Sequence, residues 1–200
     1  FIRTLTITDV CLGWTMLIPL RNSAYRWIQN ALKTLQQTLP YELHGIDTDN
    51  GSEFINKPVF EWCRNNNISF TRSRSYHKND NCFVEQKNDY AVRRFVGYCR
   101  YDSDEEYAAL KQVYEPLTLL LNYFYPAQKI INKTRIGAKV YKTYEACKTP
   151  YERLMESSLI PQAAKDKATQ QRKELSLIKL KQELDVAIAR LLFIHKRKLS

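Results

Sequence analysis

Two acidic residues, Asp49 and Glu85, constrain this chain more than any other feature, because 35 residues (50–84) separate them. Asp49 follows a short apolar stretch and precedes Asn50-Gly51, a dipeptide that favours a tight turn, so we expect Asp49 at a strand end, facing a cleft. Glu85 lies near the start of a helix that we expect over about residues 81–98. Oxygen ligands suit Mg²⁺, and a pair of such ions can activate an attacking oxygen and stabilise a leaving oxygen in phosphoryl transfer. Two carboxylates brought together in this way suit metal-dependent chemistry on phosphate esters.

The sequence around both acids resembles the integrase catalytic core of bacterial insertion-sequence transposases and retroviral integrases, the DDE superfamily. The resemblance covers most of the chain, from about residue 1 to about residue 154. It is carried by the following residues: Asp49-Asn50-Gly51-Ser52-Glu53-Phe54, the 35-residue gap, Tyr76-His77, and Glu85 followed three residues later by Asn88. It implies a ribonuclease-H-like α/β fold, a mixed sheet flanked by helices, with Asp49 and Glu85 as the last two members of an Asp, Asp, Glu triad.

The first Asp of that triad is the one departure from the family pattern. In the family it lies in a first strand, upstream of a second strand that resembles residues 8–14 here. We therefore expect the sequence to be an amino-terminally truncated copy or fragment that does not complete the metal site alone. Asp9 is then expected to be the non-catalytic acid at the end of the second strand.

The resemblance implies a transposase or integrase that cleaves DNA and transfers strands through a D,D-35-E site. Two Mg²⁺ or Mn²⁺ ions would be held by the first Asp, Asp49 and Glu85. It further implies DNA partners (element ends and target), a homo-oligomer, no small-molecule cofactor, and a place in the bacterial cytosol or nucleoid. Two alternatives remain open: a catalytically inactive DNA-binding or oligomerising remnant, and a ribonuclease-H-like metal nuclease that does not join ends.

The polar segment 72–82, together with the helix that follows it, supplies the candidate DNA contacts. Cationic and imidazole side chains can contact phosphate, a tyrosine can stack on a base, and an amide near Glu85 can contact the DNA end or support the metal site. A solvated surface loop is the equally simple alternative for any one of them. The candidates are Arg72, Arg74, Tyr76, His77, Lys78 and Asn88.

Charge is distributed unevenly along the chain. Residues 1–124 contain 14 basic and 14 acidic residues, whereas residues 125–200 contain 17 and 7, so the second part carries the entire net charge of +10. This asymmetry indicates that the second part grips backbone phosphates, with a merely solubilising basic surface as the alternative. Five widely spaced cysteines without a Cys-x-x-Cys pair favour reduced thiols, and the absence of a long apolar run argues against a membrane protein.

Hydrophobic periodicity predicts the order of the elements. Residues 1–9 and 14–20 are expected to pair as antiparallel strands, and strands at 43–48 and 68–71 to pair in parallel across a helix at 58–66 that buries Val59, Phe60 and Cys63.

We predict three parts: an integrase-like core at 1–126 without its first strand, a basic connector and short helix at 127–160, and a charged amphipathic helix at 161–200. Residues 162–198 within this part contain no Gly or Pro, and the helix is expected either to pair as a coiled coil or to pack back on the core.

Overall fold

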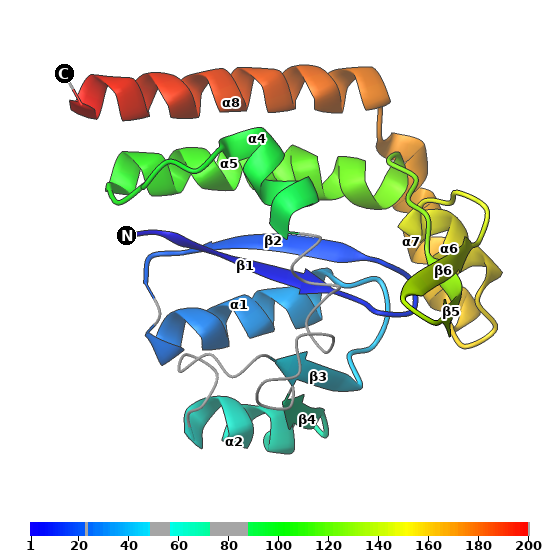
Figure 1. Cartoon of the computed structure of the whole chain (residues 1–200). Coiled ribbons are helices and arrows are strands. Elements are labelled where there is room, and N and C mark those ends of the chain that lie inside the picture. Colours follow the sequence, from blue (N-terminus) through cyan, green and yellow to red (C-terminus); the bar gives the residue numbers. More distant parts are fainter. Residues whose placement is uncertain (23, 49–56, 73–87, 200) are drawn as a thin grey trace.

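The structure, a computed structural model, describes residues 1–22, 24–48, 57–72 and 88–199. Its centre is the antiparallel pair of β1 (Arg3–Thr8) and β2 (Thr15–Leu20), covered on one face by α1 (Tyr25–Thr38) and on the other by α5 (Asp104–Tyr123) (Figure 1). A further helix, α8 (Leu177–Leu199), runs along the outer side of α5. The described residues therefore form helical layers on both faces of a strand pair, as the predicted α/β class requires.

The pairing of β1 with β2 runs in register from Arg3 opposite Leu20 to Thr8 opposite Thr15. Since successive side chains of a strand point to opposite faces, β2 contributes to two hydrophobic cores. Leu17 packs with α5 and α8, whereas Leu20 packs with the buried face of α1. The predicted first hairpin is present.

The next unit consists of β3 (Gly45–Thr48), α2 (Lys57–Asn65) and β4 (Ser69–Arg72), and the two strands pair in parallel, as predicted. The prediction that Phe60 is buried is wrong, because this side chain is 52% exposed and Trp62 is buried in its place. Val59 and Cys63 are buried, and Trp62 lies three residues after Val59, so all three share one face of the helix.

The described part of the predicted 81–98 helix comprises a π-helix, η1 (Asn88–Arg93), and the short α4 (Arg94–Val96). These elements bury Ala91, Val92 and Val96 against the α5 core.

Helix α5 lies between the strand pair and α8 (Figure 1), and its start is fixed by a capping box. The Ser103 side chain accepts from the Glu106 backbone N–H, while the Glu106 carboxylate accepts from the Ser103 backbone N–H. At the other end, buried Asn122 clamps β2: its Oδ1 accepts from the Thr15 N–H and its Nδ2 donates to the Thr15 carbonyl, each at 2.8 Å. The amide thus satisfies both backbone groups of a fully buried strand residue.

After the core, the chain forms a hairpin of β5 (Ile130–Ile136) and β6 (Lys139–Tyr144), then α6 (Pro150–Glu156), α7 (Gln162–Glu174) and α8. The single helix expected over 162–198 is two helices, with residues 175 and 176 between them. This break allows α8 to fold back onto α5, where Leu184 and Leu191 are fully buried. Of the two arrangements considered for this helix, the structure has it packed on the core. No helix among the described residues is long and apolar enough to cross a bilayer.

Candidate functional site

The predicted metal ligands, Asp49 and Glu85, lie outside the described residues, as do Arg74, Tyr76, His77 and Lys78. The elements that flank them in the sequence are described. Strand β3 ends at Thr48, directly before Asp49, and η1 begins at Asn88, three residues after Glu85. The described part of the site is therefore the edge formed by the ends of β3 and β4, together with the start of η1.

Strands β3 and β4 end at the same edge of their sheet. Because they pair in parallel with Thr48 opposite Arg72, the chain leaves both strands side by side. Arg72, a predicted phosphate contact, is exposed at this edge. Beside it, the Oδ1 of Asp47 accepts a 2.6 Å hydrogen bond from the Thr71 hydroxyl, across the strand pair. This is the edge of an α/β sheet at which ligands bind in many folds.

Asn88 is tied to the central strand pair. The Thr6 hydroxyl donates a 2.5 Å hydrogen bond to the Asn88 Oδ1, joining residues 82 positions apart. Thr6 is buried in β1, so this contact fixes the first turn of η1 against the strand. Asn88 thereby has a supporting role in the positioning of the helix on which the sequence places Glu85, whatever further contact its amide makes.

Asp9 organises the turn between β1 and β2. Its Oδ1 accepts from the Leu12 N–H at 2.6 Å and its Oδ2 accepts from the Tyr41 hydroxyl at 3.2 Å. Burial and the neighbouring Asp9 carboxylate raise the pKa of Tyr41 well above its ordinary value, so this hydroxyl stays protonated and continues to donate. Both carboxylate oxygens of Asp9 thus have a structural task within the described fold.

No cluster of three or more His, Cys, Asp or Glu side chains that could hold a metal occurs among the described residues. Every metal ligand that the sequence predicts within this chain lies in the segments left undescribed. The described residues therefore supply the scaffold and a candidate DNA contact, Arg72.

Glu106, which sequence reasoning did not single out, has a carboxyl group whose pKa is strongly lowered in the described fold. Its carboxylate is fully buried and lies 2.7 Å from the His195 Nδ1 and 3.1 Å from the Lys198 Nζ. Burial by itself would raise the Glu106 pKa, but hydrogen bonds from His195, from the backbone of Ser103 and Asp102, and from Lys198 outweigh it and lower the pKa to about 2. These contacts join the end of α8 to the start of α5, so the cluster fastens α8.

Arg153, for which the sequence predicted no role, holds the base of the β5–β6 hairpin. Only 7% of it is exposed, and its guanidinium donates to the Glu145 carboxylate and to the Ala127 carbonyl. A nearly buried cation in a basic segment carries no pattern that distinguishes it from its exposed neighbours. Its place after Thr149-Pro150, which cap α6, is the one local signal that an ordered element begins there.

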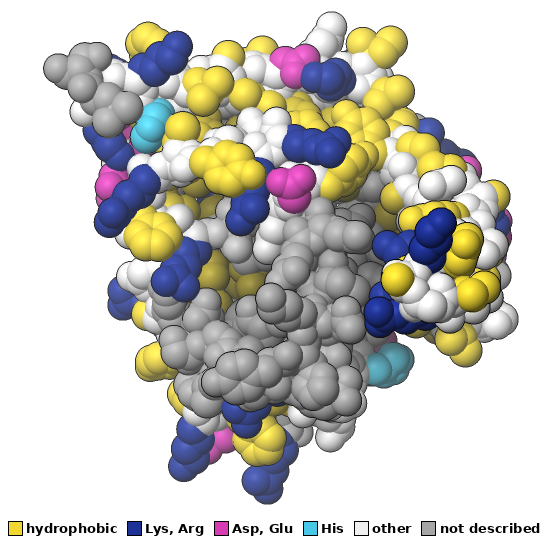
Figure 2. All heavy atoms as spheres, in the orientation of Figure 1, with side chains coloured by type: hydrophobic (Ala, Val, Ile, Leu, Met, Phe, Trp, Pro, Cys, Tyr) yellow, Lys and Arg dark blue, Asp and Glu magenta, His cyan; other side chains and the backbone are white. Residues whose placement is uncertain are grey.

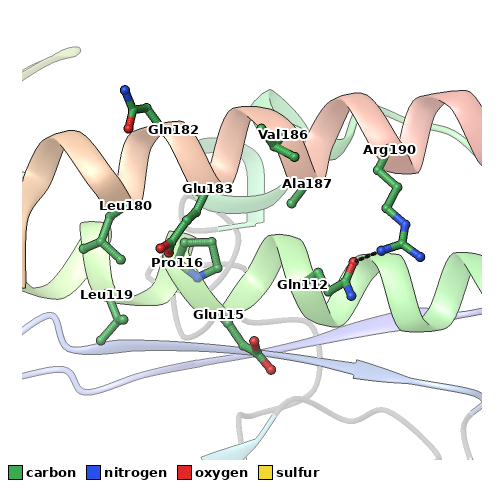
Figure 3. Close-up of a pocket in the computed structure, with 10 residues that line it drawn as sticks. All are labelled: Gln112, Glu115, Pro116, Leu119, Leu180, Gln182, Glu183, Val186, Ala187 and Arg190. Atoms are coloured by element: carbon green, nitrogen blue, oxygen red, sulfur yellow. Dashed lines mark hydrogen bonds between the residues drawn. The ribbon is translucent and has the colours of Figure 1, made fainter.

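A groove of about 610 Å³ lies between α5 and α8 (Figure 3). Its lining includes Pro116 and Leu119 from α5 and Leu180 and Ala187 from α8, and the Arg190 guanidinium donates to the Gln112 Oε1 across it. None of its lining residues is a predicted site residue. The groove shares no lining residue with the sheet edge described above.

Together, the helix-covered strand pair and the parallel β3–α2–β4 unit give the described residues a mixed α/β architecture of the ribonuclease-H-like class. The family model of the integrase core domain matches residues 1–78. This match confirms the resemblance to the integrase core that was predicted from the sequence.

Known proteins similar to this chain include one bacterial protein and two viral ones. The uncharacterized protein y4rM of Sinorhizobium fredii is 42% identical over 153 residues, which cover 76% of this chain and 44% of y4rM. The chain thus spans less than half the length of this relative.

A chain of the simian T-cell lymphotropic virus intasome is similar with a TM-score of 0.52 and 14% identity, covering 80% of this chain and 54% of that one. The BIV integrase catalytic core domain aligns with a TM-score of 0.49 and 17% identity, over 79% of this chain and 93% of that one. The likeness to the intasome chain supports the fold.

Proposed function

We propose that this chain is the catalytic part of a DDE-type transposase or integrase, a polynucleotidyl transferase that cleaves DNA and joins its ends. The observation that carries the proposal is the parallel β3–β4 pair, from whose common edge the chain enters both Asp49 and the segment containing Arg74 and Lys78. The integrase core domain match over residues 1–78 includes this edge and its flanking motif. The relative y4rM supports a bacterial setting.

In this proposal, Asp49 and Glu85 hold Mg²⁺ or Mn²⁺ together with the first Asp of the triad, since carboxylate oxygens are the ligands that these ions prefer. Two such ions, when bound, would polarise the phosphodiester and lower the pKa of the attacking water or 3′ hydroxyl. The residues of the chain position the DNA: Arg72 contacts phosphate from the sheet edge, and Asn88, fixed by Thr6, orients the Glu85 helix.

Four further residues are proposed to contact the DNA end. Arg74 and Lys78 would contact phosphates, His77 would donate to a phosphate oxygen, and Tyr76 would stack on a base. Two element ends must be held together for strand transfer, so the proposed working form is a homo-oligomer on DNA.

The test is Mn²⁺ binding by calorimetry, beside metal-dependent nicking of supercoiled DNA, for a chain that also carries the first Asp of the expected triad, and for its Asp49→Asn and Glu85→Gln variants. Asp47→Asn is the matched control, because Asp47 lies two residues from Asp49 and pairs with Thr71. We expect the control to retain Mn²⁺ binding and nicking, and the two test variants to lose both. Metal binding that survives in both test variants would refute the proposed site.

Two other outcomes correspond to the alternatives. A chain that binds duplex DNA, does not bind Mn²⁺ and yields no cleavage product is an inactive DNA-binding remnant. Cleavage that is never followed by joining of a 3′ hydroxyl to a second DNA identifies a metal nuclease.

A further inference from the structure

The β5–β6 hairpin differs from the rest of the fold in its exposure. Every residue of both strands is exposed, whereas β1 and β2 are covered by helices. Four cations, Lys133, Arg135, Lys139 and Lys142, lie on this ribbon, and residues 130–144 contain no acid. No ion pair joins any of the four to another described residue. Figure 2 shows Lys and Arg side chains gathered at the end of the molecule where β5 and β6 lie.

The positions of these cations on the ribbon are unfavourable in isolation. Lys133 lies directly opposite Lys142 in the strand register, and like charges in that position destabilise a strand pair. Arg135, two residues along, shares their face, so three cations lie on one side of the ribbon. The opposite face has Lys139 and Tyr141, the latter 55% exposed. Such a concentration of positive charge, without an ion pair to any described residue, is expected where an anion binds.

The ribbon is an ordered projection fixed at its base. Ala127 and Lys148 form a bridge below it, the Glu145 N–H donates to the Lys129 carbonyl, and Arg153 joins Glu145 to Ala127. Lys129 in turn donates a 2.6 Å hydrogen bond to the Cys11 carbonyl in the β1–β2 turn. These contacts bind the base to both α6 and the core.

The tip of the ribbon is a two-residue turn. Gly137 has φ +61°, whereas no positive φ occurs at Ala138, the combination of a type II′ turn. This turn type matches the right-handed twist of a strand pair, so the two strands stay paired to their ends. The cations are therefore presented on a pre-ordered element, which lowers the entropy lost on binding.

We propose that the β5–β6 hairpin is a duplex-DNA-binding arm whose cations contact backbone phosphates. A two-stranded ribbon fits the major groove, which is about 12 Å wide. Lys133 and Arg135 are spaced by about 7 Å along β5, with Lys142 about 5 Å across from Lys133, so they can reach neighbouring phosphates. A second copy of the arm is a poor partner because its charge is the same. The identity of the partner as DNA rests on the proposed function, but the arm needs no metal.

The test measures the affinity of the full chain for a short fluorescent duplex of random sequence in EDTA, across a range of salt concentrations. The arm variant carries Lys133→Gln, Arg135→Gln, Lys139→Gln and Lys142→Gln. The control variant removes the same net charge from exposed lysines on helices, none of which makes a side-chain ion pair with a described residue: Lys33→Gln, Lys167→Gln, Lys173→Gln and Lys179→Gln.

Each lost phosphate contact reduces the slope of log affinity against log salt by about 0.9, so the arm variant should lose about 3 to 4 in slope. When salt rises from about 50 to 200 mM, the affinity of the arm variant should therefore fall by about a hundredfold less than that of the wild type. The control variant should change the slope by less than about 1. Equal losses in the two variants, or wild-type binding by the arm variant, would overturn the inference, as would arm-dependent binding that prefers duplex RNA.

Two further measurements separate binding from folding and from catalysis. Because Lys133→Gln removes a like-charge pair, it should not lower the unfolding midpoint in urea, and a variant with arginine at positions 133, 139 and 142 should bind as the wild type does. If DNA binding does not depend on the arm while Mn²⁺ binding at Asp49 and Glu85 is intact, the arm is refuted and the proposed function stands. The reverse result would refute the metal site and leave the arm.

Discussion

The Glu106→Gln substitution tests how α8 is fastened to the core. The Glu106 carboxylate accepts from the Asp102 and Ser103 backbone N–H groups, each at 2.8 Å, and from His195 and Lys198 of α8. An amide has the shape of the protonated acid but no charge, and its NH₂ group would face donors. We expect the variant to be destabilised at neutral pH and the loss to shrink in acid.

The magnitude follows from the pKa. Lowering the Glu106 pKa from 4.5 to about 2 corresponds to about 3 kcal/mol of folding free energy at neutral pH. Because the folded-state pKa lies below the unfolded value, this stabilisation is present above about pH 4.5 and is lost as the pH falls towards about 2. At about pH 3, less than half of it should remain.

The assay is urea unfolding followed by tryptophan fluorescence at several pH values between neutral pH and the acid range. Glu105→Gln is the matched control, since Glu105 is an exposed neighbour paired with Arg197 on the surface, and it should change stability by less than about 1 kcal/mol. A Glu106→Gln destabilisation that is the same at every pH would show that the ionised form is not what stabilises the fold. A loss no larger than that of the control would refute the reasoning altogether.

Two core contacts yield further predictions for the same unfolding measurement. Asn122→Leu leaves the N–H and C=O of buried Thr15 without their partner and should lower the free energy of unfolding by about 3 kcal/mol. The control, Asn132→Ala at an exposed position, should lower it by less than about 0.5 kcal/mol. Equal effects would refute a stabilising role for the Asn122 amide. If α8 packs on α5 in solution, Leu184→Ala should lower the free energy of unfolding by about 2 to 5 kcal/mol. The control, Val186→Ala, changes a side chain that is 70% exposed and should lower it by less than about 0.5 kcal/mol. A small loss at Leu184 would show that α8 is detached.

Local patterns in the sequence were sufficient for the elements of the core. Alternation of leucine and isoleucine with threonine predicts β1, and a short helix between two apolar runs predicts the parallel β3–β4 pair. Both signals arise within a few residues of one another, so they need no knowledge of distant contacts. The site itself was predicted from a motif and its spacing, and its two acids stay a prediction.

Contacts between distant segments explain what sequence reasoning missed. Phe60 and Trp62 are both large and apolar, and only the packing of α2 determines which of them is buried. The break after Glu174 appears because the chain must change direction for α8 to lie on α5, and helical periodicity does not predict such a change. The low pKa of Glu106 depends on His195, which lies 89 residues away in the sequence.

The uneven charge of the chain has two different physical meanings once the fold is known. At the end of α8, Arg197 and Lys198 pair with acids at the start of α5, so this positive charge is used within the fold. On the β5–β6 hairpin, no acid lies within residues 130–144. Salt screens exposed charges far more than buried ones, so rising salt should release DNA from the hairpin well before it loosens the buried contacts of Glu106. The same basic composition therefore acts as an internal fastening in one place and as a phosphate-binding surface in the other.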